Sequence, residues 1–150
     1  MSTWCKTLLV RVAGERGAVS LELVIIAPAL LLILGVAIYA GRVSTAGQTV
    51  EQAASAAART ASIARTGPAA QTTGDAAARD SLTQQGLRCT STSINVDTSG
   101  FTRTVGTPAA VTVTVTCVVN TSDLAFPGIP GSRTVTGTAV SPLDTYRSRT

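Results

Sequence analysis

Residues 16–41 read RGAVSLELVIIAPALLLILGVAIYAG, and this stretch decides how the chain folds and where it resides. It contains nineteen uncharged, mostly aliphatic residues from Leu23 to Gly41. At about 1.5 Å per residue, a helix of this length spans roughly 28 Å, close to the roughly 30 Å hydrocarbon thickness of a bilayer. The pattern predicts a transmembrane helix over residues 18–41. Glu22 stands at the mouth of the apolar run, where a carboxylate is costly and therefore indicates a functional role.

Pro28 interrupts the apolar run. A proline breaks a helix in water but is tolerated in a membrane helix, where neighbouring groups satisfy the freed carbonyl. We therefore expect the helix to continue through this position with a kink between Val24 and Pro28.

The charges on either side of the apolar run predict its orientation. Residues 1–17 carry three basic residues, the last at Arg16, against one acid, and the next basic residue is Arg42. Positively charged flanks stay on the cytoplasmic side of a membrane. The prediction is a cytoplasmic leader over residues 1–17, a single-pass helix over residues 18–41 in the cell membrane, and an extracytoplasmic or cell-surface domain over residues 42–150.

The composition excludes most catalytic and metal-binding chemistry. The sequence has no histidine, one lysine, Lys6 in the leader, and scattered acidic residues. Histidine-based catalysis and most zinc sites need residues that are missing, and the acidic spacing fits neither a carboxylate pair nor a calcium loop. We predict a non-enzymatic protein with no catalytic residue, metal, cofactor or small-molecule substrate. Beyond the leader nine arginines face seven acids, a balance too thin for nucleic-acid binding.

A helix is predicted to continue from the membrane span over residues 42–65. This segment has no proline, one glycine and many alanines, which gives it a high helix propensity. Its small apolar residues recur every three or four positions and so share one face: Val43, Ala46, Val50, Ala53, Ala54, Ala57, Ala61 and Ala64. A second, shorter helix is expected over residues 75–85, after a loop at residues 71–75 and before a C-terminal stop at Gly86.

Three stretches rich in Thr, Ser and Val predict strands at residues 89–97, 110–120 and 133–141. The middle one, VTVTVTCVV in its core, places valines and Cys117 on one face and threonines on the other. We expect an α+β fold in which a three-stranded antiparallel sheet packs one face on the long helix and leaves the other in water.

Two connections complete this fold. Residues 98–108 are expected to form a hairpin link that contains two glycines. The AFPGIPGS loop at residues 125–132 carries Phe126 and Ile129, which either cap the core or contact a partner.

Cys89 and Cys117 are the two cysteines of the predicted domain. Such a pair in an oxidising exterior usually bridges, and a closed loop of about 28 residues contributes on the order of 3 kcal/mol. The alternation complicates this prediction, because Cys117 falls on the valine face whereas Cys89 falls opposite Ile94 and Val96 unless it precedes the strand. Cys5, in the leader, is expected to be a reduced thiol.

Gly17-Ala-Val-Ser-Leu-Glu22, before the apolar run, has the spacing of the processing site of type IV prepilin-like proteins. With its flanks, ERG before and LELVIIAPALLL after, it resembles the N-terminus of TadE-like proteins of the tight-adherence (Flp-type) pilus system. The segment EQAASAAARTAS, the two late cysteines and the stretch from Val140 to Arg147 also look like the TadE-like pattern. Leu23 departs from the Phe or Tyr that often follows the glutamate in pilins of this class, which weakens a major-pilin assignment more than a TadE-like one.

The resemblance implies that a prepilin-type peptidase cuts after Gly17, so that Ala18 begins the mature chain. Its new amine then lies four positions before Glu22 on one helical face, where the charges can pair with each other or with a neighbour. Two alternatives remain open: Glu22 is merely the last charge in the headgroup zone, or a signal peptidase cuts near Ala37 to Ala40.

The resemblance and the composition together predict a TadE-like pseudopilin or minor pilin that acts in tight-adherence pilus assembly. Its implied partners are a prepilin-type peptidase, other pilus subunits, the assembly machinery and the membrane. The alternative is a permanently anchored cell-surface binding module, whose sheet and AFPGIPGS loop recognise a ligand.

Overall fold

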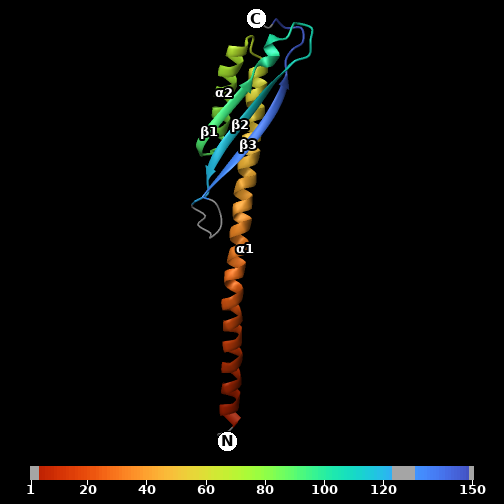
Figure 1. Cartoon of the computed structure of the whole chain (residues 1–150). Helices are drawn as coiled ribbons and strands as arrows, with labels where there is room; N and C mark the ends of the chain where they lie inside the picture. Colours follow the sequence, from red (N-terminus) through yellow and green to blue (C-terminus); the bar gives the residue numbers. More distant parts are fainter. Residues whose placement is uncertain (1–3, 123–130, 149–150) are drawn as a thin grey trace. The chain divides into compact units, whose positions relative to one another are not determined.

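The computed structural model describes residues 4–122 and 131–148, with side chains described from residue 23 onward. The elements follow in the order α1 (Trp4–Ser62), α2 (Gly67–Gln84), β1 (Cys89–Asp97), the 3-10 helix η1 (Ser99–Thr102), β2 (Ala110–Asn120) and β3 (Ser132–Pro142) (Figure 1). The predicted α+β class, with two helices and a three-stranded antiparallel sheet, is confirmed. Phe126 and Ile129 lie outside the described residues.

The chain divides into two compact units, Met1–Ala40 and Gly41–Thr150. The first holds the N-terminal part of α1, and the second, here called the C-terminal unit, holds the remainder of α1 and all other elements. The core described below therefore belongs to the C-terminal unit.

Helix α1 is longer at its N-terminus than the predicted membrane helix. It begins at Trp4 rather than Ala18 and ends at Ser62 rather than Arg65. The leader contains no proline, and extending an existing helix adds one hydrogen bond per residue without a new nucleation step. The helix runs through Pro28, as expected. The kink at that position stays a prediction.

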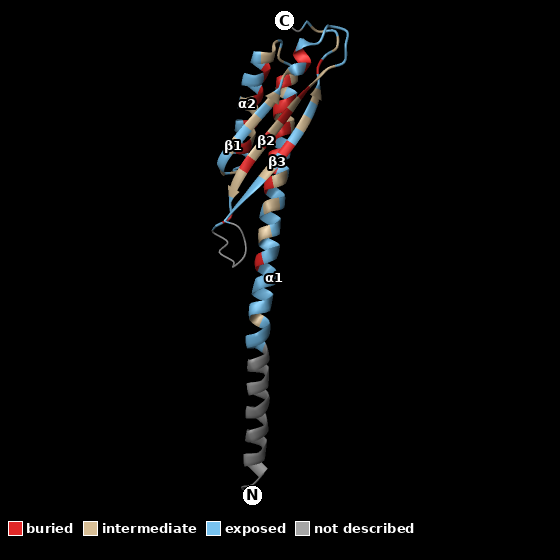
Figure 2. Cartoon of the chain, viewed as in Figure 1, coloured by how far each residue is buried: buried red, intermediate tan, exposed pale blue. Residues whose placement is uncertain are grey.

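The sheet has the strand order β1-β2-β3, with both pairings antiparallel. The predicted ranges hold at both ends of β1 and β2, and β3 is one residue longer at each end. Alternate residues of β2 face the core, where Val111, Val113, Val115 and Cys117 are fully buried. Figure 2 shows buried residues both on β2 and on the part of α1 behind the sheet.

The other face of the sheet is lined by hydroxyl side chains. Thr114 lies opposite Thr138 and Thr116 opposite Thr136, and their hydroxyl oxygens are 3.3 and 3.4 Å apart. Cross-strand pairs of this kind contribute roughly 0.2–1 kcal/mol each. The predicted division of β2 into a valine face and a threonine face is thus confirmed.

Helix α1 approaches the sheet closely because the residues between them are small. At Gly137 of β3, an added Cβ would lie 2.7 Å from the Glu51 nitrogen and 2.8 Å from the Val50 carbonyl carbon. Glycine therefore lets the strand backbone touch the helix backbone. The small-residue face predicted for this helix is buried at Ala46, Val50, Ala53, Ala54, Ala57 and Ala61, together with Ala58.

Helix α2 begins at Gly67, earlier than predicted, and residues 71–75 are helical rather than a loop. Thr66 caps the helix, since its hydroxyl accepts a hydrogen bond from the Ala69 amide at 3.3 Å. Pro68 occupies the first turn, where its missing amide hydrogen has no partner to lose. These two residues start the helix before the segment whose composition suggested a loop.

Gly74 misled the prediction because glycine lowers helix propensity. In the fold it lies where α2 meets α1 and β1. An added Cβ there would lie 3.3 Å from the Ala61 Cβ and 3.3 Å from the Val96 Cγ2. Tertiary packing, rather than local propensity, explains a glycine in the middle of this helix.

Helix α2 ends in a Schellman motif at Gly86. The Gly86 amide donates to the Thr83 carbonyl at 3.0 Å, and the Leu87 amide donates to the Leu82 carbonyl at 3.1 Å. Gly86 adopts a φ of 69°, which glycine tolerates without strain. The predicted stop at Gly86 is confirmed, and the two leucines pack on the core beside the start of β1.

A β-bulge near the start of β1 brings the two cysteines to the same face of the sheet. Cys89 lies opposite Val119 and Ser91 lies opposite Val118, so the strand contains one extra residue between them. This shift reverses the alternation that placed Cys89 on the wrong face in the sequence. The predicted disulfide between Cys89 and Cys117 is present, with a Cα–Cα distance of 5.4 Å.

The link from β1 to β2 contains η1 in place of a simple hairpin turn, and it buries Phe101. C-terminal residues close the same end of the core. The Leu143 amide donates to the Ala109 carbonyl at 2.8 Å, and the Arg147 guanidinium donates to the Ile63 carbonyl at 2.7 Å. The latter satisfies a carbonyl left without a helical partner just beyond the end of α1.

Removal of the disulfide is expected to destabilise the C-terminal unit. The double substitution Cys89→Ser and Cys117→Ser opens a loop with a sequence separation of 28. In the chain-entropy model this costs on the order of 3 kcal/mol of unfolding free energy. Urea unfolding of the full chain in detergent micelles, followed by circular dichroism, measures the loss. Cys5→Ser is the control, and equal midpoints for all three proteins would contradict the prediction.

Two glycine-to-alanine substitutions are expected to act in opposite directions. Gly137→Ala drives a Cβ into the backbone of α1 and costs about 1–3 kcal/mol of stability. Gly47→Ala, inside α1, meets only the Val135 Cγ1 at 3.8 Å. It should stabilise the fold by about 0.5–1 kcal/mol, because alanine is the better helix former. The same urea experiment measures both, and effects of the same sign would contradict the packing argument.

Candidate membrane-insertion and processing site

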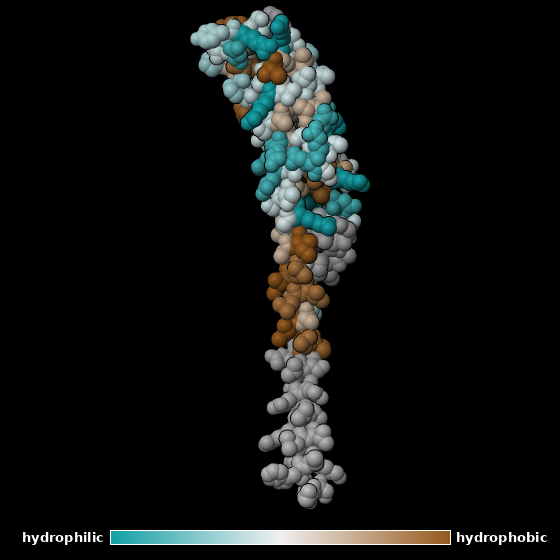
Figure 3. Space-filling model, turned by 180° about the vertical axis from the view of Figure 1, so that it is seen from behind, coloured by the Kyte–Doolittle hydropathy of each residue, from teal (hydrophilic) through white to brown (hydrophobic). Residues whose placement is uncertain are grey.

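Residues 23–38 of α1 present an apolar surface. Every large aliphatic side chain from Leu23 to Ile38 is exposed. Figure 3 shows this part of the helix as a continuous hydrophobic surface. An 18-residue window within Leu23–Ser62 has a mean hydropathy of 2.7, with 6% of the window buried. By length and composition, this helix fits a membrane anchor.

The residues of the predicted processing site lie in this same helix. Gly17, Ala18 and Glu22 fall within α1, in the segment whose helix is described without its side chains. Since a helix has 3.6 residues per turn, positions 18 and 22 share one face. Cleavage after Gly17 and charge pairing by Glu22 stay predictions.

The described side chains, those of residues 23–122 and 131–148, contain no cluster that could hold a metal ion. In that part of the chain no three His, Cys, Asp or Glu residues lie together in a way that could hold a metal ion. The two cysteines of the core, Cys89 and Cys117, are joined to each other.

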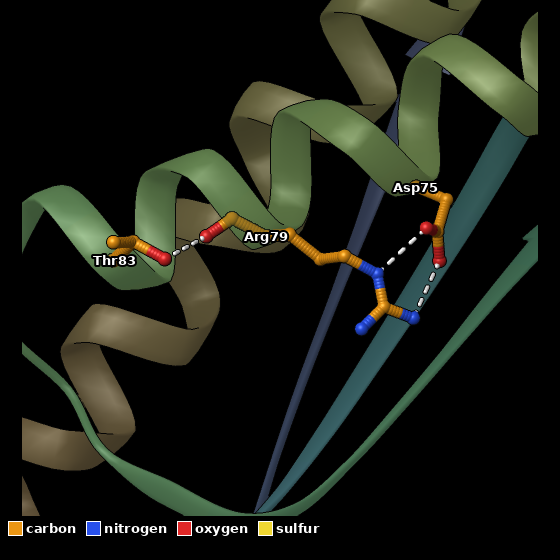
Figure 4. Close-up of polar contacts among 3 residues, drawn as sticks. All are labelled: Asp75, Arg79 and Thr83. Carbon is orange, nitrogen blue, oxygen red and sulfur yellow. Dashed lines mark hydrogen bonds and ion pairs between the residues drawn. The ribbon is translucent and has the colours of Figure 1, made fainter.

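Helix α2 carries an ion pair between Asp75 and Arg79 on its exposed surface. The Arg79 guanidinium donates to both carboxylate oxygens of Asp75, at 2.7 and 3.2 Å, and Thr83 donates to the Arg79 carbonyl (Figure 4). The hydrogen bond and the charge of Asp75 raise the pKa of Arg79. The pair is exposed and four residues apart on one helix, an arrangement that contributes little stability.

Asp97 marks the exit from β1. Its carboxylate accepts a hydrogen bond from the Ser99 amide at 2.9 Å, and this bond lowers the pKa of Asp97. The contact closes a turn into η1. The role of Asp97 is therefore structural.

Sequence reasoning missed a groove between α2 and β1. Two open hollows lie along it, of about 540 Å³ and about 340 Å³. Their lining from α2 includes Gln71, Asp75, Arg79 and Thr83, spaced four residues apart and hence on one face. That spacing was visible in the sequence. The second helix was predicted to begin at residue 75, however, so Gln71 was assigned to a loop and the four residues were not placed on one helix face.

Comparison with protein-family models matches residues 17–59 to the family described as TadE-like protein. No curated protein and no solved structure gives a significant match to the chain. The matched range begins at Gly17, includes the exposed apolar span and ends within the small-residue face of α1. This match supports the prediction that the protein is a component associated with the tight-adherence pilus. Over residues 17–59 the chain is therefore similar to the TadE-like family, which supports the resemblance found in its sequence.

Proposed function

We propose that this protein is a TadE-like pseudopilin or minor pilin, a non-enzymatic, membrane-anchored component of tight-adherence pilus assembly. The observation that carries the proposal is the family match, which begins at Gly17 and continues through the exposed apolar span. A span of this kind is stable when lipid or a neighbouring helix covers it.

In this proposal a prepilin-type peptidase on the cytoplasmic side removes residues 1–17. The basic leader supports this orientation, because Lys and Arg favour the cytoplasmic side. The C-terminal unit then lies outside the cell membrane. Its disulfide supports an oxidising location, since such bonds are rare in the cytosol.

Glu22 would act as the assembly residue. After cleavage it is the fifth residue of the mature chain, one helical turn from the new amine of Ala18. A charge near the apolar zone costs about 2.5–3.5 kcal/mol on insertion scales unless it is paired. Pairing with the amine of its own chain, or with that of a neighbour, removes this cost and orients adjacent subunits.

Gly17→Leu is expected to block removal of the leader, because a bulky side chain replaces the residue before the cut. Intact-mass spectrometry of membrane preparations should find Ala18 as the first residue of the unmodified protein and the full leader on the variant. Gly14→Leu, also in the leader, is the control and should be processed normally. An intact leader, or a start beyond residue 40, in the unmodified protein would instead favour a permanent anchor or signal-peptidase cleavage.

Glu22→Gln is expected to leave processing intact but to lower the amount of protein in sheared surface material by more than about tenfold. An amine left unpaired near lipid costs more than the 1.4 kcal/mol that corresponds to a factor of ten. Quantitative blotting of the sheared fraction against the membrane fraction measures this. Glu15→Gln, in the removed leader, is the matched control. Equal surface amounts for both variants would refute the assembly role of Glu22.

A further inference from the structure

The groove between α2 and β1 has two unlike walls. One wall is the face of α2 that carries Gln71, Asp75, Arg79 and Thr83, and the other is the edge of β1. The hollow near the end of α2 is also lined by Leu82, Leu87, Arg88, Cys89 and Thr92, and the second hollow by Ile94, Asn95 and Val96. Both hollows thus follow β1 along its length.

The groove exists because the helical layer is wider than the sheet. Two packed helices lie about 8–10 Å apart and are each about 10 Å thick, so together they span about 18–20 Å. Three strands spaced about 4.8 Å apart span about 14 Å. In Figure 1, α1 passes behind the sheet and α2 lies along the outer side of β1. The uncovered width beside β1 corresponds to one additional strand.

The outer edge of β1 also offers unpaired backbone groups. Its inner edge pairs with β2. Within residues 4–122 and 131–148, no backbone hydrogen bond reaches β1 from any element other than β2. Such an edge binds an extended polypeptide through main-chain hydrogen bonds. The bulge near Cys89 limits regular pairing to Ser91–Asp97.

Charge at the two ends of the groove favours one direction for the added strand. Arg79 and Arg88 line the hollow at the start of β1, whereas Asp75 lines the hollow at its other end. Arg79 already pairs with Asp75, but Arg88 forms no ion pair with a described residue. A strand antiparallel to β1 ends beside Arg88, so that a carboxylate at its C-terminus meets this guanidinium.

We propose that the α2/β1 groove binds an extended peptide segment of another protein as a fourth, antiparallel strand of the sheet. The segment alternates apolar and polar residues, places its apolar side chains toward Leu82, Ile94 and Val96, and ends in one or more carboxylates at Arg88. The free edge of β3 lacks this groove, because α2 lies at the opposite side of the sheet. This inference does not depend on leader removal, so either proposal can fail without the other.

The test uses the full chain in detergent micelles and the fluorescein-labelled peptide KTVTVTVE with a free C-terminus. Fluorescence anisotropy measures the affinity, and protein-free micelles give the background. Hydrogen-exchange mass spectrometry locates the bound peptide. Protection is expected at residues 92–97 of β1 and not at residues 132–142 of β3. A peptide methylated on every second backbone amide should lose binding, since it cannot complete the ladder.

A charge reversal identifies the Arg88 contact. Arg88→Glu should weaken binding of KTVTVTVE at least about tenfold, and the amidated peptide KTVTVTVK should recover affinity on that variant. Arg133→Glu, on β3, is the matched control and should change affinity less than about twofold. The proposal is overturned if no saturable binding occurs up to about 1 mM. It is equally overturned by protection at β3 instead of β1, or by equal effects of the two arginine variants.

Discussion

The C-terminal unit depends on the close contact between the small-residue face of α1 and the elements that cover it. Gly137 brings the backbone of β3 against Val50 and Glu51, and Gly74 brings α2 against Ala61. Close contact matters because dispersion attraction falls steeply with separation, so a gap of even 1 Å forfeits much of it. A bulkier residue at either glycine would separate two layers rather than perturb one side chain.

This kind of core has a limited capacity for hydrophobic stabilisation. Each alanine removes little apolar area from water. The larger buried side chains come mainly from β2, and other elements add Val50, Leu82, Phe101 and Leu143. Small domains with modest cores commonly rely on covalent links. The Cys89–Cys117 bond joins the start of β1 to the central strand, next to the turn that leaves α2. It therefore supports the region where three elements meet.

The parts of this fold that could be predicted are those in which the spacing of apolar residues along the sequence matches the face that the fold buries. The valine alternation of β2 and the alanine face of α1 indicated both their structure and their contacts.

The features that sequence reasoning missed arise from contacts between distant segments. Gly74 reads locally as a helix breaker, although it is a packing residue against α1 and β1. The bulge near Cys89 depends on pairing with Val119, and no local pattern encodes it. The α2/β1 groove is likewise a property of two elements together, whereas the residues from Gly17 to Glu22 form a short linear motif.

The threonine rows on the solvent-facing side of the sheet affect how this chain can contact other proteins. The middle of this face carries Ser93, Asn95 and paired threonines, without charge or aromatic rings. Tyrosine, tryptophan and arginine are the usual anchors of protein contacts, and they are missing from these rows. The face is thus polar and offers few anchor residues for a protein contact. A protein that met this face would find few anchoring side chains, so specific contacts are expected at the margins of the sheet.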